Sequence, residues 1–495
     1  MVYQLIKSRS ARRHWPLALV LLYWAVRLHN LDALPIFLDE AAHLDWSRLV
    51  WLRQPFHAAS DGKLLSIWVH ALFWPFAATA WIGRVSTLLV TTLGFAALLA
   101  ITKNLFSRRA AAFAGMLYIV VPFAMFFERM ALPDAFTAAF TVLLVWSSLM
   151  LVRNPDQKKL VFLTGFSMAA NVLSKVPNLV FAYVPALAAI LFRASPIWRL
   201  QWRAVVRSYM ILFWILLPLY AVLRWIVFSD MGLDLISGKS MTFGDALLNV
   251  GTTVGVVIEN YRVLLSPQII IPIVLSSIVT LTWYPRPGLY LALAIFPYLG
   301  LTYLGTSVGF IEARFAVVSV SMLLILTAGG FERALLYVTG RGPIVHATSG
   351  IVLVLLLLPS LGFVVRAWSS PEQLGLPQRD KWEYVTGWPS GYGFREIAED
   401  YEPSAALLQL VTLDLGGRQR LQAYLPPDSL VTPVWISLED FEAGVRPEAH
   451  MGRALLVLDH PKDDHAIERL DLSLAEIGRY PRPGGESWLT VYEFR

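Results

Sequence analysis

The chain has 495 residues, of which 56% are hydrophobic and only 15% are charged, and its mean hydropathy is +0.57. Ordinary soluble domains carry about 25% charged residues, so this composition excludes a set of soluble domains and indicates a membrane protein. The net charge of +6 comes from basic residues scattered between apolar segments, which does not favour a nucleic-acid partner. The absence of cysteine excludes disulfides, thiolate metal sites and cysteine nucleophiles.

Apolar stretches long enough to cross a bilayer, about 20 residues each, recur from the N-terminus to about residue 366. The first of them, from Trp15, follows basic residues but precedes no small-x-small cleavage site, so we expect an uncleaved spanning helix. We predict about 11 transmembrane helices. They lie near 15–34, 84–102, 110–127, 135–152, 160–174, 177–192, 207–228, 268–284, 289–306, 315–331 and 344–366.

Successive loops between these spans are alternately rich and poor in Lys and Arg. This alternation predicts the orientation of the chain in the membrane. With the N-terminus in the cytoplasm, the inner segments are basic and their only acids are Asp156 and Glu332. The outer loops hold more acids than bases. The inner basic residues are Lys7, Arg9, Arg12, Arg13, Lys103, Arg108, Arg109, Arg153, Lys158, Lys159, Arg193, Arg199, Arg203, Arg207, Arg286, Arg333 and Arg341.

Two of the predicted outer loops, 35–83 and 229–267, are unusually long. Each contains an amphipathic stretch, from Leu64 to Phe76 and from Gly244 to Leu265. Counting the first stretch as a span would place Arg108 and Arg109 outside, against the charge bias. We therefore expect both stretches to be helices that lie in the membrane interface.

The composition changes after about residue 366, where charge, proline and glycine become frequent. The run Ala454–Leu458 predicts a strand and the stretch Ala466–Ile477 predicts a helix. We divide the chain into a transmembrane domain at 1–366 and a small soluble α/β domain at 367–495. Because the number of predicted spans is odd, the second domain falls on the extracytoplasmic side.

Charged residues collect at the outer membrane boundary, where an ionisable side chain is a candidate functional residue. The adjacent carboxylates Asp39 and Glu40 could repel each other, share a proton, hold a cation or accept a proton from a nucleophile. Carboxylates beside several cations suit a substrate that carries phosphate, because cations neutralise a phosphate leaving group. The candidates are Asp39, Glu40, His43, Lys63, Arg84, Glu128, Arg129, Asp134, Lys175, Arg262, Glu312 and Arg314.

Each candidate also has a purely structural explanation. Lys63 and Arg84 could be anchors whose charged ends mark the membrane interface. The Glu and Arg residues at 128–129 and at 312–314 could form local ion pairs, and His43 could be either a core residue or a proton shuttle. The recurrence of charge in four separate outer loops favours the functional interpretation.

These residues lie in short motifs whose order and spacing resemble those of the polytopic membrane glycosyltransferases of the C-type fold. The resemblance is to the protein O-mannosyltransferase and aminoarabinose lipid A transferase group, and it covers about residues 1–330 well and the remainder weakly. The motifs are Leu38–His43, Gly62–Trp68, Gly83–Leu88, Glu128–Phe136, Leu173–Lys175, Glu312–Phe315 and Tyr384–Gly393.

The resemblance implies an enzyme with a lipid-linked sugar donor. By that resemblance, Asp39 activates the acceptor hydroxyl and Glu40 is a supporting carboxylate. Lys63, Arg84 and Arg314 bind the phosphate of the polyprenyl-phosphate donor. Asp134 helps to shape the acceptor or metal side of the cavity. The other candidates for the acceptor site or the cavity are His43, Glu128, Arg129, Lys175 and Arg262.

We therefore expect a multi-pass glycosyltransferase of a bacterial inner membrane. It would move a monosaccharide from polyprenyl phosphate to a hydroxyl on a lipid, glycan or protein, with inversion, at the extracytoplasmic face. The chain has neither a GxxxxGK[ST] loop nor a Rossmann fingerprint, so no nucleotide site is expected. No cofactor is assigned, although a divalent cation is compatible with the carboxylates.

Two other functions are open at this level. A transporter or flippase of a phosphate-bearing lipid-linked substrate could use the same charges, although such proteins usually show repeats and broken helices at the bilayer midplane. A non-catalytic polymer-binding protein could act through residues 367–495 alone.

The predicted orientation can be tested by introducing single cysteines into this cysteine-free chain. We expect Gly375→Cys to react with an impermeant maleimide applied from outside and Leu105→Cys to react only after the membrane is permeabilised. Labelling of Leu105→Cys but not of Gly375→Cys from outside would overturn the orientation.

Overall fold

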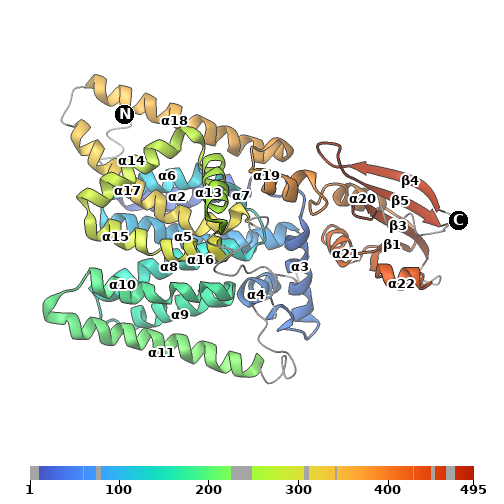
Figure 1. The fold of residues 1–495 in the computed structure, drawn as a ribbon, viewed down its shortest axis with the longest axis horizontal. Helices are drawn as coiled ribbons and strands as arrows, with labels where there is room; N and C mark the ends of the chain where they lie inside the picture. The colour runs from blue at the N-terminus through green and yellow to red at the C-terminus, as the bar shows by residue number, and fades with distance from the viewer. Residues whose placement is uncertain are drawn as a thin grey trace.

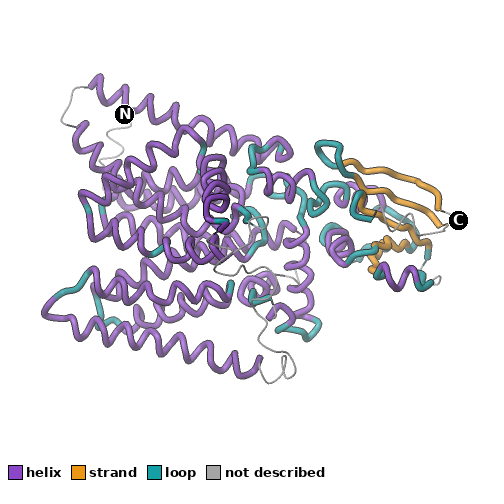
Figure 2. The backbone as a smooth tube through the Cα atoms, in the orientation of Figure 1, coloured by secondary structure: helices purple, strands orange, loops and turns teal. Residues whose placement is uncertain are grey.

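The computed structural model describes residues 11–59, 61–73, 80–223, 248–305, 311–339, 343–426, 428–447, 452–463 and 474–494. A large bundle of helices is joined at one end to a smaller domain that contains the strands (Figures 1 and 2). The predicted fold class, a helical membrane protein with a small C-terminal α/β domain, is confirmed.

Most of the chain up to residue 369 is helical. The helices are α2 (Ala11–Leu28), α3 (Leu38–Trp51), α4 (Leu64–Phe73), α5 (Ala80–Leu105), α6 (Arg108–Val120), α7 (Pro122–Phe127), α8 (Pro133–Arg153), α9 (Lys158–Ser174), α10 (Val184–Leu191), α11 (Trp198–Val222), α13 (Val250–Leu265), α14 (Pro267–Trp283), α15 (Pro285–Leu293), α16 (Phe296–Gly305), α17 (Val317–Thr339) and α18 (Pro343–Ser369). Short 3₁₀ segments, Val176–Tyr183 and Ala313–Ala316, precede α10 and α17.

Within the described residues, each predicted span falls mainly on helix, but several are divided into two shorter helices. The span predicted at 110–127, for example, is broken between α6 and α7 at Pro122, which cannot donate a backbone hydrogen bond. Among the described residues, four helices are long and apolar enough to cross a membrane alone, or five if the bent pair α13–α14 counts as one. The count of 11 spans therefore stays a prediction. Of the second long loop, residues 229–247 lie outside the described residues.

Small residues allow the central helices to approach closely. A Cβ at Gly94 on α5 would come within 2.7 Å of the Cα of Ala139 on α8. Membrane helices gain little from the hydrophobic effect against lipid, so close packing through such positions is what holds them together.

A buried polar network joins α2, α6 and the end of α7. Glu128 accepts hydrogen bonds from the hydroxyls of Tyr23 and Tyr118, at 3.1 and 2.5 Å, and from Nε of Arg27 at 3.1 Å. Glu128 and Arg27 are both almost completely buried. The expected local pair with Arg129 is not formed, and the geometry does not support a place for Glu128 at the acceptor side of a cavity. A buried carboxylate needs a cation and donors, and α2 supplies the cation.

The C-terminal domain contains a five-stranded mixed sheet in the order β2-β1-β3-β5-β4. Strand β1 pairs in parallel with β2 and β3, whereas β5 pairs antiparallel with β3 and β4. The strands are β1 (Leu408–Thr412), β2 (Val431–Trp435), β3 (Arg453–His460), β4 (Leu474–Pro481) and β5 (Trp488–Phe494). The helices are α19 (Gln378–Lys381), α20 (Phe394–Tyr401), α21 (Leu415–Gln422) and α22 (Leu438–Glu442).

The strand predicted at Ala454–Leu458 is confirmed within β3. The helix predicted at Ala466–Ile477 is wrong at its end, because residues from Leu474 onward form β4; residues 464–473 lie outside the described residues. The pairing of β4 with β5, through a bulge between Glu476 and Gly478, outweighs the local helical pattern.

The Glu128 network predicts a stability effect separate from any activity. Glu128→Ala leaves Arg27 buried without its counter-charge, which typically costs about 3–5 kcal/mol of stability. We expect a clearly lower apparent Tm for the purified protein in detergent. The control is Glu476→Ala, which breaks an exposed pair with Arg479 that contributes little to stability. Equal Tm values for the two variants would contradict the structural role.

Candidate active site

Asp39 and Glu40 lie in the first turn of α3, between the bundle and the C-terminal domain (Figure 1). The free backbone N–H groups at this helix end favour negative charge. Neighbouring residues on a helix point about 100° apart, so the two carboxylates face different surroundings. Glu40 is fully buried, whereas 36% of the Asp39 side chain is exposed.

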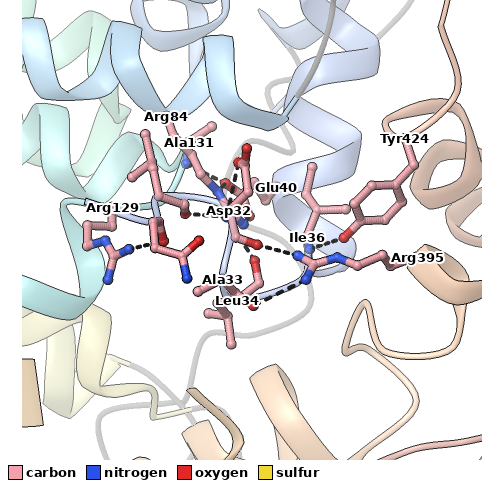
Figure 3. Close-up of polar contacts among 12 residues, drawn as sticks. Asp32, Ala33, Leu34, Ile36, Glu40, Arg84, Arg129, Ala131, Arg395 and Tyr424 are labelled. Carbon is pink, nitrogen blue, oxygen red and sulfur yellow. Dashed lines mark hydrogen bonds and ion pairs between the residues drawn. The ribbon is translucent and has the colours of Figure 1, made fainter. Parts of the chain in front are cut away.

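The Glu40 carboxylate forms a bidentate pair with Arg84 on α5, at 2.8 and 2.7 Å (Figure 3). Glu40 also accepts a hydrogen bond from the backbone N–H of Ala131 at 2.8 Å. Nη1 of Arg84 donates to the carbonyl oxygens of Leu31 and Leu34 at 2.9 and 2.8 Å. This buried cluster therefore ties the start of α3 to α5 and to the loop before α8.

The prediction that Arg84 binds the donor phosphate is not supported by this geometry. Each nitrogen of its guanidinium already donates to a protein oxygen, and the side chain is 1% exposed. The charge of Glu40 is likewise matched by Arg84. The sequence indicated that Arg84 and Glu40 both lie at the outer membrane boundary. It did not show that their side chains pair with each other.

The Asp39 carboxylate faces cations instead. Nη2 of Arg314 lies 2.8 Å from Asp39. Burial alone would raise the pKa of the Asp39 carboxyl, but Arg314 and Lys63 outweigh it and hold that pKa well below its usual range. Asp39 is therefore an ionised, partly exposed carboxylate.

Arg314 is surrounded by further carboxylates that come from two parts of the chain. Glu312 forms an ion pair with it, and Glu383, after α19, lies 3.8 Å from it. Asp380 accepts a hydrogen bond from the backbone N–H of Ala313 at 3.4 Å. Burial, reinforced by Glu312, raises the pKa of Asp380 to about 7, and burial also raises the pKa of Glu383.

Sequence reasoning missed Asp380 and Glu383, because it sought charged site residues only in the outer loops of the transmembrane domain. Both acids lie just before the motif Tyr384–Gly393. That motif was the available signal. The local ion pair between Glu312 and Arg314, which the sequence left open as a structural alternative, is formed.

Lys63 lies in the turn that leads into α4. Its Nζ is 3.4 Å from Nε2 of His43 and 2.5 Å from Asp61. Burial and the Lys63 charge lower the pKa of His43 well below its usual value, so its imidazole is uncharged at neutral pH. The carbonyl of Gly62 accepts a hydrogen bond from the N–H of Val176, which brings the Lys63 turn beside the end of α9.

Lys175, at the end of α9, pairs with Asp134 at the start of α8 at 3.0 Å. Its Nζ lies 4.6 Å from the centroid of the Phe315 ring, and the guanidinium of Arg314 lies 5.9 Å from the same centroid. Five predicted site residues therefore gather around Asp39: Lys63, His43, Asp134, Lys175 and Arg314.

Two other predicted residues lie apart from this group. Arg129 donates to the carbonyl oxygens of Asn30 and Ala367, at 2.5 and 2.9 Å, and so joins the end of α2 to the end of α18. Arg262 is exposed on α13 and pairs with none of the described residues. The geometry does not support either as a residue of the acceptor side.

A metal is not supported by the side chains present. Among the described residues, no group of three or more His, Asp or Glu side chains is arranged to hold a metal ion. The carboxylates near Asp39 are paired with cations instead. We derive no step through a metal.

Comparison with known proteins agrees with this architecture. Residues 62–225 match the family model described as dolichyl-phosphate-mannose-protein mannosyltransferase. No curated protein sequence is significantly similar to the chain.

Solved structures match over nearly the whole chain. ArnT from Cupriavidus metallidurans bound to undecaprenyl phosphate has a TM-score of 0.61 at 14% identity, covering 96% of this chain and 98% of that chain. Its apo form has a TM-score of 0.59 at 14% identity, covering 97% and 98%. The apo oligosaccharyltransferase of Archaeoglobus fulgidus has a TM-score of 0.50 at 12% identity, covering 92% of this chain and 71% of that chain.

The resemblance noted from the sequence motifs is thus confirmed at the level of fold and family domain. The chain is an integral membrane protein with the C-type glycosyltransferase fold, and its residues 62–225 match the model of the dolichyl-phosphate-mannose-protein mannosyltransferase family.

Proposed function

We propose that this protein transfers a monosaccharide from a polyprenyl phosphate to a hydroxyl acceptor, with inversion, at the extracytoplasmic face of a bacterial inner membrane. The observation that carries the proposal is the partly exposed carboxylate of Asp39, which lies beside the cations Arg314 and Lys63. That ArnT was solved with undecaprenyl phosphate bound supports a lipid phosphate as the donor group.

In this proposal Asp39 is the general base. The acceptor hydroxyl attacks the anomeric carbon, Asp39 takes the hydroxyl proton, and the bond from the anomeric carbon to the phosphate oxygen breaks. The polyprenyl phosphate leaves with the electron pair of that bond. A single displacement from the face opposite the leaving group inverts the anomeric carbon.

The cations act on the leaving group. Lys63 and Lys175 are each about one-fifth exposed, so their ammonium groups can reach a phosphate while their other contacts persist. Arg314 also acts on the leaving group while it remains paired with Asp39. Cations placed where negative charge develops stabilise the transition state.

Arg84 and Glu40 have a different part in this proposal from the one predicted. We assign them the role of a structural pair that fixes the start of α3, because their charges and donors are already matched. Glu40 thus supports Asp39 by fixing the backbone at the start of α3, and it takes no part in the proton transfer.

The role of Asp39 is tested by Asp39→Asn, which keeps the size of the side chain but removes a positioned base. We expect turnover to fall by about 10²–10⁴-fold while the affinity for the donor stays nearly unchanged. Because the pKa of Asp39 is held low, wild-type turnover should not decline on acidification until well below an ordinary aspartate pKa of about 3.9. The measurement is turnover of a radiolabelled polyprenyl-phosphate sugar.

The matched control is Asp156→Asn, an exposed acid between α8 and α9. It should retain wild-type turnover. Each variant must first elute as a monodisperse peak in detergent, so that misfolding is not read as lost catalysis. Full turnover of Asp39→Asn would reject Asp39 as the base and favour a transporter or binding protein.

The roles of Lys63 and Arg84 are separated by a pair of variants. Lys63→Ala should weaken the binding of a non-reactive donor analogue at least about tenfold, since a hydrogen bond to a charged group contributes about 1.5–3 kcal/mol. Arg84→Lys should lower the apparent Tm but leave donor affinity in the folded protein unchanged. If Arg84→Lys loses donor affinity and Lys63→Ala does not, the two roles are reversed.

A further inference from the structure

The segment that leads into the Asp39 helix has no regular structure of its own. This entry segment, residues 29–37, joins α2 to α3. Its backbone carbonyls are bound by side chains from elsewhere: Arg84 binds those of Leu31 and Leu34, and Arg129 binds that of Asn30 (Figure 3). These contacts hold one side of the segment against the bundle.

The C-terminal domain binds the other side of the same segment. Arg395 on α20 donates to the carbonyl oxygens of Asp32 and Ala33, the latter at 3.3 Å. The hydroxyl of Tyr424 accepts a hydrogen bond from the N–H of Ile36 at 2.6 Å. The Arg395 guanidinium lies 5.7 Å from the centroid of the Tyr424 ring, so the two residues act from one place (Figure 3).

The contact continues into the first turn of α3. The N–H of Leu38, the residue before Asp39, donates to the carbonyl of Pro389 at 2.9 Å. A Cβ on Gly391 would overlap the carbonyl oxygen of Ile36, so the two backbones approach too closely for any residue with a side chain at this position. The domain therefore fixes backbone atoms on both sides of residue 37.

A second contact lies about two turns further along α3. Asp45 pairs with Arg418 at 2.5 Å and accepts from Gln419 at 3.1 Å, and both partners are on α21. All three side chains are largely buried. With contacts at its start and at Asp45, α3 is held in both position and rotation.

An ordinary domain interface would pack side chain against side chain. Here, besides the side-chain contacts of Asp45, the C-terminal domain binds backbone groups of the segment that leads directly into Asp39. An open cleft borders Asp32, Ala33, Arg395 and Tyr424. Water can enter there and compete for the same carbonyls when Arg395 is removed.

We propose that the C-terminal domain positions the catalytic centre, with Arg395 and Tyr424 holding the backbone that sets the place of Asp39. The proposal rests on the proposed function of Asp39. Arg395 and Tyr424 touch neither donor nor acceptor and act through α3. A displacement of a catalytic group by about 1 Å can cost about 10²-fold in rate.

The test uses the full-length purified protein with Arg395→Ala, Arg395→Lys and Tyr424→Phe. The control is Arg453→Ala, which removes an exposed arginine of the same domain that pairs with Glu493, away from the entry segment. We expect Arg395→Ala and Tyr424→Phe to lower kcat by about 10–100-fold with the donor KM within about twofold. Arg395→Lys should recover part of the loss, because an ammonium can still donate to a carbonyl.

A double variant separates positioning from a general loss of structure. If Arg395 acts through Asp39, then Asp39→Asn with Arg395→Ala should turn over no more slowly than Asp39→Asn alone. Additive losses would overturn the proposal.

Hydrogen exchange supplies a readout that does not depend on activity. In Arg395→Ala and Tyr424→Phe, we expect the backbone amides of residues 36–40 to exchange about tenfold faster, with no change in Arg453→Ala. Unchanged exchange, or faster exchange with unchanged kcat, would overturn the proposal. If Asp39→Asn is itself fully active, the proposed base is wrong, and the exchange result still shows whether the domain holds α3.

Discussion

The pairing of Arg84 with Glu40 is the interaction on which the rest of the site depends. Removing two charges from water is costly, and the cost is recovered only when the geometry is good and the remaining donors are satisfied. Here the guanidinium meets a bidentate carboxylate and two carbonyls. Few arrangements meet all of these requirements together, so the pair fixes the start of α3 in one place relative to α5.

The adjacent residue takes the opposite role because of helical geometry. Since Glu40 points inward, Asp39 is turned toward Arg314 and Lys63, where it is partly exposed. The acids around Arg314 have different pKa values because their immediate surroundings differ. Asp39 stays ionised at low pH because cations face it, whereas burial and neighbouring acids raise the pKa values of Asp380 and Glu383. Environment, not residue type, assigns the roles.

Much of this site could be predicted from the sequence, since charge at one membrane boundary and the ordered motifs pointed to Asp39, Lys63, Lys175 and Arg314 as neighbours. The directions of side chains could not be predicted. Arg84 and Glu128 carry the same charges whether they face a cavity or the core, and only the long-range partners decide. For Glu128 that partner is Arg27, about a hundred positions earlier in the chain.

The C-terminal part shows the same limit more strongly. Its local patterns predicted one strand correctly, but β4 forms only because β5 returns beside it. Glu383 lies near Arg314, and Asp380 binds the backbone of Ala313, although both acids come about 70 positions later in the chain.

That docking also gives a physical reason for the domain to be part of the same chain as the bundle. A carboxylate at the end of an irregular segment would move with that segment, and catalysis tolerates little displacement of a base. The bundle alone restrains the segment through Arg84 and Arg129 on one side. Arg395 and Tyr424 restrain the segment from a second side. In our proposal, this second restraint is what holds the Asp39 carboxylate in the position that catalysis needs.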